Sequence, residues 1–450
     1  MTMHVIRALL FLMSAGYALL AQQNSPGLEG IRRDIGAGVA AAYQRLEPLY
    51  EEFHSHPELS LHEEKTSARL ADELTQLGFE VTRKVGGHGV VGVLKNGTGR
   101  TVLIRTDMDA LPVIEQTGAP YASSVKATDD KGNTVGVMHA CGHDMHMTVF
   151  LGVARLLTEL KEKWHGTLVM MGQPAEEKSH GAKEMLADGL FTRFPRPDYC
   201  LALHCAPELS AGMVGVTEGY ALANVDSVDI LIRGVGGHGA WPHKTKDPIV
   251  LAAQTVLALQ TIVSRETDPT QPAVVTVGSI HGGAKHNIIP DEVRLQLTLR
   301  SYSDDVRKNT IEAVRRITRG LAEAAGIPED RYPTVTMADE STPATYNNPE
   351  LARRLLGVFK NWFGENRTVS TKPIMGAEDF GMLGRTEDKI PICIFWLGTV
   401  DPEKFKESQR TGKALPALHS SQFLPVPEPT FKTGATAMTA AVLDLFTKAQ

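Results

Sequence analysis

Three short apolar runs, each followed by ionisable side chains, are the feature that most limits how this chain can fold. The runs cover residues 102–104, 168–171 and 199–203, and helical patterns separate them. Short apolar runs that alternate with helices are typical of buried strands in a mainly parallel α/β sheet. Such sheets bind ligands beyond the carboxyl ends of their strands. The sequence therefore predicts a site at one edge of a parallel sheet.

The side chains that follow these runs are carboxylates and an imidazole. The first run leads into Asp107 and Asp109, the second into Glu176 and Glu177, and the third into His204. Each carboxylate pair taken alone is an ordinary feature of a solvated loop. Convergence of all three on one sheet edge is much harder to obtain by chance, so we expect these groups to meet.

A segment of eight residues between the first two runs has the composition of a metal site. Residues 139–146 contain three imidazoles, one thiol and one carboxylate, and an apolar run with helical spacing follows them. This pattern predicts that Cys141 and His143 lie on the loop entering a helix, where the helix dipole favours a thiolate. A structural cysteine with solvent-facing histidines is the alternative. We assign His139 and His146 to helix entry or to the support of ligands.

The first 21 residues have the pattern of an export signal. Arg7 precedes an apolar run that ends near Ala21, and the chain turns polar at Gln22. The run is too short and too weakly flanked for a stable membrane span, so we expect cleavage near Ala21 and a secreted or periplasmic protein. An uncleaved N-terminal anchor is the alternative. The net charge of −6, without a long Lys/Arg block, argues against nucleic acid as a partner.

A second unit interrupts the alternation of helix and strand. From residue 225 the expected order is strand, helix, strand, strand, helix and strand, over 225–233, 247–264, 272–280, 291–302, 303–325 and 333–337. This is the βαββαβ order of a compact split unit. The α/β pattern then resumes, and His419 is the last plausible ligand along the chain. We therefore expect a site assembled from both sides of an insertion.

Eight short motifs occur in order along the chain. They are His-Pro-Glu-Leu-Ser at 56–60, Arg-Thr-Asp-Met-Asp-Ala-Leu-Pro at 105–112, the segment 139–146, Gln-Pro-Ala-Glu-Glu at 173–177, His-Gly-Ala-Trp-Pro-His at 238–243, Asn-Ile-Ile-Pro at 287–290, Gly-Ala-Glu-Asp-Phe at 376–380 and Leu-His-Ser at 418–420. Together they resemble the aminoacylase/carboxypeptidase superfamily of co-catalytic metallopeptidases. The resemblance covers about residues 36–447. It is closest to the amidohydrolase branch, which contains hippurate hydrolases, N-acyl-amino acid amidohydrolases and indoleacetyl-amino acid hydrolases.

The resemblance implies an α/β fold with two domains. A zinc-peptidase-like catalytic domain with a mainly parallel central sheet would carry an inserted α+β, ferredoxin-like lid or dimerisation domain. A length of 450 residues suits more than one core. The implied division is a signal peptide at 1–21, catalytic parts at 28–217 and 335–450, and the inserted domain at 218–334.

The resemblance also implies two divalent metal ions per subunit. Their ligands would be Cys141, His143, Glu177, His204 and His419, with Cys141 in the bridging position. Imidazole, thiolate and carboxylate donors suit zinc, manganese, cobalt or nickel and disfavour calcium or magnesium. We expect manganese or zinc.

Two aspartates near the metal site receive supporting roles. Asp107 stands where the wider superfamily usually has a metal-binding histidine, so we do not assign it as a ligand. Asp109 is expected to orient a ligand through a hydrogen bond, which commonly affects metal affinity and activity.

The resemblance supplies four further roles. Glu176 would be the general base that accepts a proton from the attacking water and passes it to the leaving amine. His238 would stabilise the oxyanion in the neighbouring subunit of a homodimer. Asn287 and Arg300 would bind the substrate carboxylate, for which arginine is well suited. Alternatively, Arg300 is a surface charge on a strand face.

These expectations define a metal-dependent amidohydrolase. It would cleave the amide bond of an N-acyl amino acid to a carboxylic acid and a free amino acid. Trp241, Met375 and Phe380 hint at an apolar acyl group. A dipeptidase or carboxypeptidase with the same chemistry is the alternative enzyme, and a non-catalytic metal-containing binding protein is the alternative class. The expected partners are a small N-acyl amino acid or peptide and a second copy of the chain, with no nucleic acid and no stable membrane span after processing.

Overall fold

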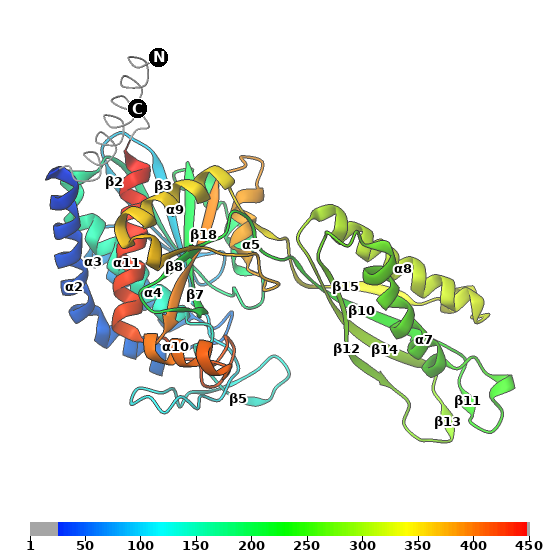
Figure 1. The fold of residues 1–450 in the computed structure, drawn as a ribbon. Coiled ribbons are helices and arrows are strands. Elements are labelled where there is room, and N and C mark those ends of the chain that lie inside the picture. Colours follow the sequence, from blue (N-terminus) through cyan, green and yellow to red (C-terminus); the bar gives the residue numbers. More distant parts are fainter. Residues whose placement is uncertain (1–25, 448–450) are drawn as a thin grey trace, which may run out of the picture.

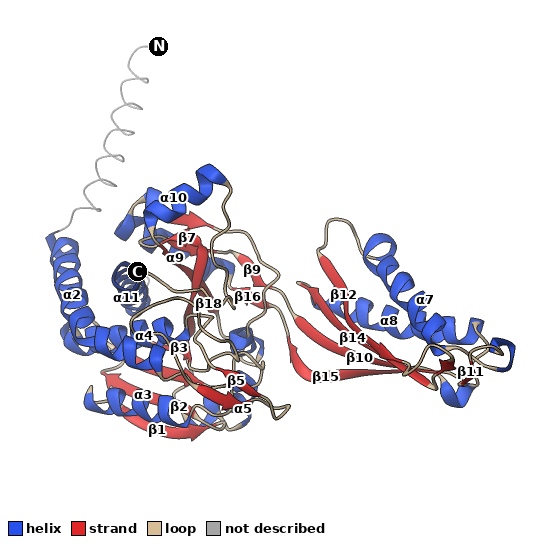
Figure 2. Ribbon diagram, turned by 90° about the horizontal axis from the view of Figure 1, so that it is seen from below, coloured by secondary structure: helices blue, strands red, loops and turns tan. Residues whose placement is uncertain are grey.

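The computed structural model describes residues 26–447, which form a larger and a smaller unit (Figure 1). The predicted signal segment, 1–21, lies outside the described residues. The larger unit is built on an eight-stranded sheet and the smaller unit on a four-stranded sheet. The two units appear as separate lobes in perpendicular views (Figures 1 and 2).

The larger sheet has the strand order β1-β2-β6-β3-β7-β18-β8-β17. Its four central strands, β6, β3, β7 and β18, are parallel neighbours, and antiparallel pairs flank them. This confirms the predicted α/β fold with a mainly parallel central sheet. The strands are β1 (Glu80–Val85), β2 (Gly89–Asn96), β3 (Thr101–Asp107), β6 (Gly166–Gln173), β7 (Tyr199–Ser210), β8 (Val214–Val216), β17 (Thr368–Ser370) and β18 (Ile392–Val400).

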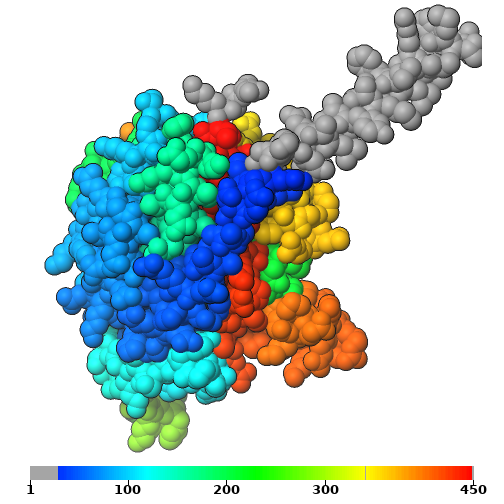
Figure 3. Space-filling model, turned by 90° about the vertical axis from the view of Figure 1, so that its left-hand side faces the viewer, coloured from blue at the N-terminus to red at the C-terminus, as the bar shows by residue number. Residues whose placement is uncertain are grey.

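Helices cover both faces of this sheet, which is why its strands are apolar on both sides. On β18, Phe395 and Leu397 pack into the core of one face, while Ile394 and Trp396 pack into the core of the other. The first face carries α2 (Pro26–Ser55), α3 (Glu64–Gln76), α4 (His143–Glu159), α9 (Pro349–Phe363) and α11 (Pro427–Phe446). The second carries α5 (Gly181–Ala187), α6 (Leu190–Arg193) and η6 (Asp379–Arg385). The space-filling view shows α2 (blue) lying against α11 (red) (Figure 3).

The smaller unit has the predicted βαββαβ order. Its antiparallel sheet runs β12-β14-β10-β15, which is the ferredoxin-like arrangement. Both helices cover one face, where Ile230, Leu295 and Val314 are buried in a core of their own. The strict alternation of apolar and polar side chains in the sequence made these strands predictable. The elements are β10 (Val225–Arg233), α7 (Pro248–Thr261), β12 (Ala273–Gly282), β14 (Glu292–Ser301), α8 (Asp304–Ala324) and β15 (Thr334–Thr342), with a π-helical turn, η3 (Ile262–Glu266), after α7.

Several short elements have no counterpart in the prediction. β9 (Gly219–Leu222) pairs with β16 (Thr345–Asn347) on the two chain segments that flank the four-stranded sheet. The strands β8 and β17 have three residues each, too few to show a periodic pattern. β7 continues to Ser210, so His204 lies inside this strand and not directly after it.

A buried ion triad joins α2 to the start of α4. His54 contacts Asp144 Oδ2 through Nδ1 at 2.6 Å and Glu115 Oε1 through Nε2 at 3.0 Å. The three side chains are at most 1% exposed. Although burial lowers the pKa of His54, hydrogen bonds to Asp144 and Glu115 raise it to about 10. His54 is therefore a buried cation at neutral pH.

We predict that this triad makes stability depend on pH. The folded-state pKa of His54, about 10, exceeds the ordinary value of 6.5. The stabilisation is therefore complete below pH 6.5 and is lost as the pH rises towards 10, by roughly 1.4 kcal/mol per pH unit. Urea unfolding of the wild type and of His54→Gln, both metal-free, should give a larger difference in unfolding free energy at pH 6 than at pH 9. An equal difference at both pH values would contradict the prediction.

Candidate active site

The ionisable groups predicted to meet at one sheet edge do so. Asp107, the last residue of β3, lies opposite Gln173, the last residue of β6. On the other side of β3, Arg105 lies opposite Ala202 of β7, two residues before His204. His143 is the first residue of α4, and Cys141 lies on the loop before it, as predicted. Parallel register thus brings four segments of the chain to one place.

The predicted ligands form two groups that share Cys141. One group is Cys141, His143 and His204, and the other is Cys141, Glu177 and His419; the ligand atoms within each group lie within 4.8 Å of one another. Cys141 Sγ is 3.5 Å from His204 Nε2. His419 Nε2 is 3.5 Å from Glu177 Oε2. A thiol common to two groups is what a ligand bridging two ions requires.

The imidazoles of the first group are oriented by backbone carbonyls. His143 Nδ1 donates to the carbonyl oxygen of Asp109 at 2.8 Å, and His204 Nδ1 donates to that of Cys205 at 2.8 Å. Each Nε2 is left to coordinate, as in metal-bound histidines. His143 Nε2 and Glu177 Oε1 are buried and have no hydrogen-bond partner. Because buried polar atoms are rarely unpaired, these donors fit a divalent metal centre.

Burial controls the protonation of these groups. Burial and the nearby Glu177 raise the pKa of the Cys141 thiol well above its usual range. In the absence of a cation, burial and the nearby carboxylates oppose the helix dipole, so a thiolate at Cys141 needs a cation nearby. Burial lowers the pKa of His204 to about 3, which keeps the neutral, ligating form. Burial and Glu378 raise the pKa of Glu176.

Asp107 and His146 support the ligands through a connected set of hydrogen bonds. Asp107 accepts from Arg105 Nη1 and from His146 Nδ1, each at 2.7 Å. His146 Nε2 accepts from the backbone N–H of Cys205 at 2.8 Å. Since both of its ring nitrogens are bonded to protein, His146 is not free to bind a metal. His139 is buried, and neither of its ring nitrogens has a hydrogen-bond partner.

Asp109 lies between His143 and the turn after β6. The carbonyl oxygen of Asp109 accepts the hydrogen bond from His143 described above. Asp109 Oδ2 accepts hydrogen bonds from Ser60 Oγ at 2.6 Å and from the backbone N–H of Glu177 at 3.0 Å. Its Oδ1 is 3.5 Å from His143 Nδ1. Asp109 therefore couples one candidate ligand to the segment that carries another, in agreement with an orienting role.

Sequence reasoning missed a buried charge network beside Glu176. Arg105 contacts Asp107 at 2.7 Å, Glu378 at 2.8 Å and Asp379 at 3.3 Å, and all four side chains are at most 1% exposed. Carboxylate oxygens of Glu176, Glu378 and Asp379 lie within 4.8 Å of one another. The motifs at 105–112 and 376–380 carry one arginine and an acidic pair, and this charge complement was the signal that could have linked them.

The smaller unit does not bring His238 or Asn287 to this site within one chain. His238 lies on β11 (Gly237–His238), which pairs with β13 (Ile288–Ile289) at the end of the smaller unit far from the larger one (Figure 1). His238 and the adjacent Asn287 are exposed. Arg300, on β14, is half-buried, and its Nη1 has no hydrogen-bond partner.

Two of the three residues taken as hints of an apolar acyl pocket, Phe380 and Trp241, lie elsewhere. Phe380 is fully buried in the core of the larger unit. Trp241 is exposed beside His238, with the ring centroids 4.9 Å apart. Neither residue lines the cavity between the units, so the hint is not supported by the geometry of a single chain.

A cavity of about 740 Å³ lies between the open face of the four-stranded sheet and the loop that follows Glu177. Asp130, Lys178 and His180 line it from the larger unit. The sheet lines it with mainly polar side chains, including Ser227, Asp229, Ser279, Gln296 and Thr298. Lys178, which directly follows Glu177 in the chain, is the lining residue nearest in sequence to the candidate ligands.

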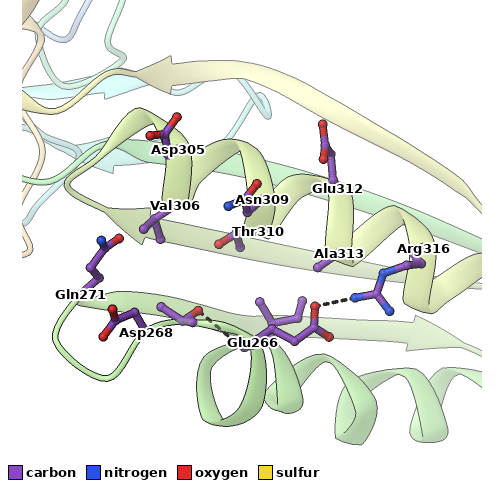
Figure 4. Close-up of a pocket in the computed structure, with 12 residues that line it drawn as sticks. Glu266, Asp268, Gln271, Asp305, Val306, Asn309, Thr310, Glu312, Ala313 and Arg316 are labelled. Atoms are coloured by element: carbon purple, nitrogen blue, oxygen red, sulfur yellow. Dashed lines mark hydrogen bonds and ion pairs between the residues drawn. The ribbon is translucent and has the colours of Figure 1, made fainter.

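A second hollow, of about 690 Å³, lies on the helix side of the smaller unit (Figure 4). Val306, Thr310 and Ala313 of α8 lie towards the segment that contains Glu266 and Asp268, and Arg316 pairs with Glu266. None of the predicted site residues lines this hollow. We therefore assign the chemistry to the edge of the larger sheet.

Comparison with known proteins identifies the family. The chain matches the model of peptidase family M20/M25/M40 over residues 103–410. It is 37% identical over 388 residues to thermostable carboxypeptidase 1 of Saccharolobus solfataricus, covering 85% of this chain and 91% of that protein. It is 39% identical over 338 residues to hippurate hydrolase of Campylobacter jejuni, covering 75% of this chain and 84% of that protein. The chain belongs to peptidase family M20/M25/M40.

Family membership agrees with the chemistry of the site. Among solved structures, the chain resembles YxeP of Bacillus subtilis, a dinuclear metal-binding peptidase of the M20 family, with a TM-score of 0.72, 26% identity, and coverage of 90% of this chain and 99% of that one. The predicted family and the predicted metal-dependent hydrolysis of amide bonds are confirmed. The ligand and base assignments rest on the geometry described above.

The shared thiol leads to a prediction about metal content. We expect Cys141→Ala to lower occupancy at both positions, because Cys141 belongs to both ligand groups. His204→Ala and His419→Ala should each weaken metal binding at one of the two positions and leave binding at the other unchanged. Elemental analysis after dialysis measures the bound ions per chain, with Cys393→Ala as a matched control because Cys393 is equally buried and belongs to neither group. Two bound ions in Cys141→Ala would exclude the bridging role.

Proposed function

We propose that this amidohydrolase cleaves N-acyl amino acids to a carboxylic acid and a free amino acid. The observation that carries the proposal is the position of Glu176 beside the two ligand groups. His143 Nε2 is 3.9 Å from Glu176 Oε2 and 3.8 Å from Glu177 Oε1. One glutamate of the pair can thus bind metal with Cys141 and His419, while the other stays free to move a proton.

Cys141, His143, Glu177, His204 and His419 would hold two divalent ions. When bound, such ions polarise the amide carbonyl and make water a stronger acid. Glu176 then accepts a proton from the attacking water and donates it to the nitrogen of the leaving amine. Arg105, which lies behind Asp107 and Glu378, holds the surrounding carboxylates in place. A hydrogen-bond donor from the smaller unit, His238 in our proposal, stabilises the oxyanion.

The substrate class is supported by the named relatives. Similarity to hippurate hydrolase favours an N-acyl amino acid, and similarity to thermostable carboxypeptidase 1 makes a peptide the alternative. In our proposal Asn287 and Arg300 bind the substrate carboxylate. A panel of hippurate, N-acetyl amino acids and dipeptides separates the two classes. The panel is assayed after the protein has been loaded with manganese, zinc, cobalt or nickel. We propose manganese or zinc as the physiological metal. No hydrolysis of any substrate by fully metal-loaded protein would indicate a binding protein.

We predict that Glu176→Gln retains its metal ions but hydrolyses substrate at least about a hundredfold more slowly, the usual effect of removing a general acid/base. Glu177→Gln is the matched control, because it changes the adjacent residue in the same way but should lower metal content. Steady-state kinetics and elemental analysis on both variants measure this. Near-normal turnover by Glu176→Gln would remove Glu176 from the mechanism.

We also propose a homodimer formed by the smaller units. On α7, Leu257 is 73% and Val250 is 54% exposed, although the helix also packs on its own sheet through Leu251 and Leu259. By length and composition alone, Pro248–Glu266 is the one described helical segment apolar enough to cross a membrane, and only 33% of its most apolar window is buried. The adjacent β12 is an edge strand. Pairing about a two-fold axis would cover both features.

We predict that His238 acts in the site of the partner subunit, which subunit mixing can test. Glu176→Gln and His238→Ala chains are each expected to be nearly inactive. In a mixed dimer, one site combines an intact Glu176 with an intact His238 from the other chain. Random exchange of equal amounts should therefore restore about a quarter of wild-type activity. Demonstrated exchange without recovery would assign His238 to its own chain or to structure alone.

We further propose export to the periplasm or medium with removal of the first 21 residues. The support is the sequence pattern, in which Arg7 precedes the apolar run. Sequencing of the mature N-terminus tests it, since cleavage near Ala21 is expected and retention of Met1 in exported protein would favour the uncleaved anchor.

A further inference from the structure

The turn that carries Glu176 and Glu177 has a strained backbone. Ala175 and Ser179 have φ values of 48° and 55°, in the left-handed region that residues with side chains rarely adopt. A Cβ added at Gly181 would lie 1.6 Å from the carbonyl oxygen of Pro174, so the turn folds tightly against its own start. Such conformations persist only where the surroundings hold them.

Glu63 is the side chain that holds this turn from outside. Its Oε1 accepts the backbone N–H of Ala175 at 2.8 Å and that of Leu61 at 3.0 Å. Leu61 also has a positive φ, of 71°. Glu63 immediately precedes α3, but its side chain does not cap that helix. One buried carboxylate oxygen therefore fixes two left-handed residues that are far apart in the sequence.

The segment 60–63, which contains Glu63, also fixes the other end of the Glu176–Glu177 pair, through Ser60. Ser60 Oγ donates to Asp109 Oδ2, and that oxygen also accepts the backbone N–H of Glu177. The pair is thus held at Ala175 by Glu63 and at Glu177 by Asp109 with Ser60. This gives a function to the motif at 56–60 and its continuation to Glu63, which the proposed mechanism does not use.

We infer that Glu63 is a positioning residue, whose hydrogen bond to Ala175 aims Glu176 at the substrate and Glu177 towards Cys141 and His419, with which it forms a ligand group. The inference rests on the proposed function for the role of Glu176. Glu63 Oε2 is buried and has no hydrogen-bond partner. Both backbone N–H groups donate to Oε1, so this one acceptor oxygen is what the turn contacts. Glutamine can supply the same acceptor, and alanine cannot.

The test compares Glu63→Ala, Glu63→Gln and Glu58→Ala in the metal-loaded full chain. Glu58 is the matched control, because it lies in the same segment and its carboxylate accepts the backbone N–H groups of Lys65 and Thr66, not that of Ala175. Three quantities are measured: kcat and KM on the best substrate of the panel, bound metal per chain, and hydrogen exchange of a peptide covering 174–181. Glu63→Met, which keeps the side-chain volume, replaces Glu63→Ala if the latter does not fold.

We expect Glu63→Ala to lose about tenfold or more in kcat, with KM changed less than about twofold, since small misplacements of reacting groups are costly. In this variant, hydrogen exchange of the peptide 174–181 should become faster, and the metal ions should be bound less tightly. Glu63→Gln should stay within about threefold of wild-type kcat. Glu58→Ala should lower the melting temperature but leave kcat and exchange of the turn unchanged.

Three results would overturn the inference. The first is wild-type exchange of 174–181 in folded Glu63→Ala. The second is wild-type kcat in that variant while Glu176→Gln, assayed in parallel, is inactive. The third is equal damage by Glu63→Gln or Glu58→Ala. If Glu176→Gln is instead fully active, the proposed function fails, while the exchange measurement still decides whether Glu63 anchors the turn.

Discussion

The interaction on which the active-site edge depends is the buried pairing of Arg105 with three carboxylates. Charges removed from water are stable only when they are paired and hydrogen-bonded, and breaking such a pair typically costs about 3–5 kcal/mol. Arg105 lies on β3, whereas Glu378 and Asp379 lie more than 270 residues later, at the start of η6. Through Asp107 the network reaches His146 on α4 and the backbone of β7. One guanidinium thus fixes the relative positions of four elements that carry or support the candidate ligands.

The near side of the site gathers acidic groups around the Cys141 thiol. Burial and the nearby Glu177 and Glu176 raise the pKa of this thiol. Although burial lowers the pKa of His143, Asp107 and Asp109 raise it to about 10. Burial raises the pKa of Cys141 and of Glu176, so their charged forms need positive charge nearby. Divalent ions held by the candidate ligands would supply that charge. The fixed guanidinium of Arg105 and such ions would then have complementary roles, and both follow from burying many acids at one sheet edge.

Residue spacing and hydrophobic alternation were enough to predict the helices and strands and the residues at their ends. Cys141 and His143 at the start of α4, the carboxylates after β3 and β6, and the strands of the smaller unit were predicted from spacing and alternation. The pairing of Arg105 with Glu378 was not, because no periodicity links residues so far apart. The effect of burial and of nearby carboxylates on the pKa of Cys141 also follows from tertiary packing and not from the spacing of the motif. The relation of His238 to the site depends on how two units or two chains meet, which no local pattern encodes.

The candidate ligands come from both sides of the insertion, yet their geometry does not depend on where the smaller unit lies. The backbone N–H of His419 donates to the carbonyl oxygen of Ala140 at 2.8 Å, directly beside Cys141, and that of Gln116 donates to Ser421 at 2.8 Å. These bonds join the two halves of the larger unit at the ligands themselves. The left-handed backbone of His419, with φ of 65°, is held by the first of them. A different position of the smaller unit, or its pairing with a second copy, would therefore leave the candidate ligands in place.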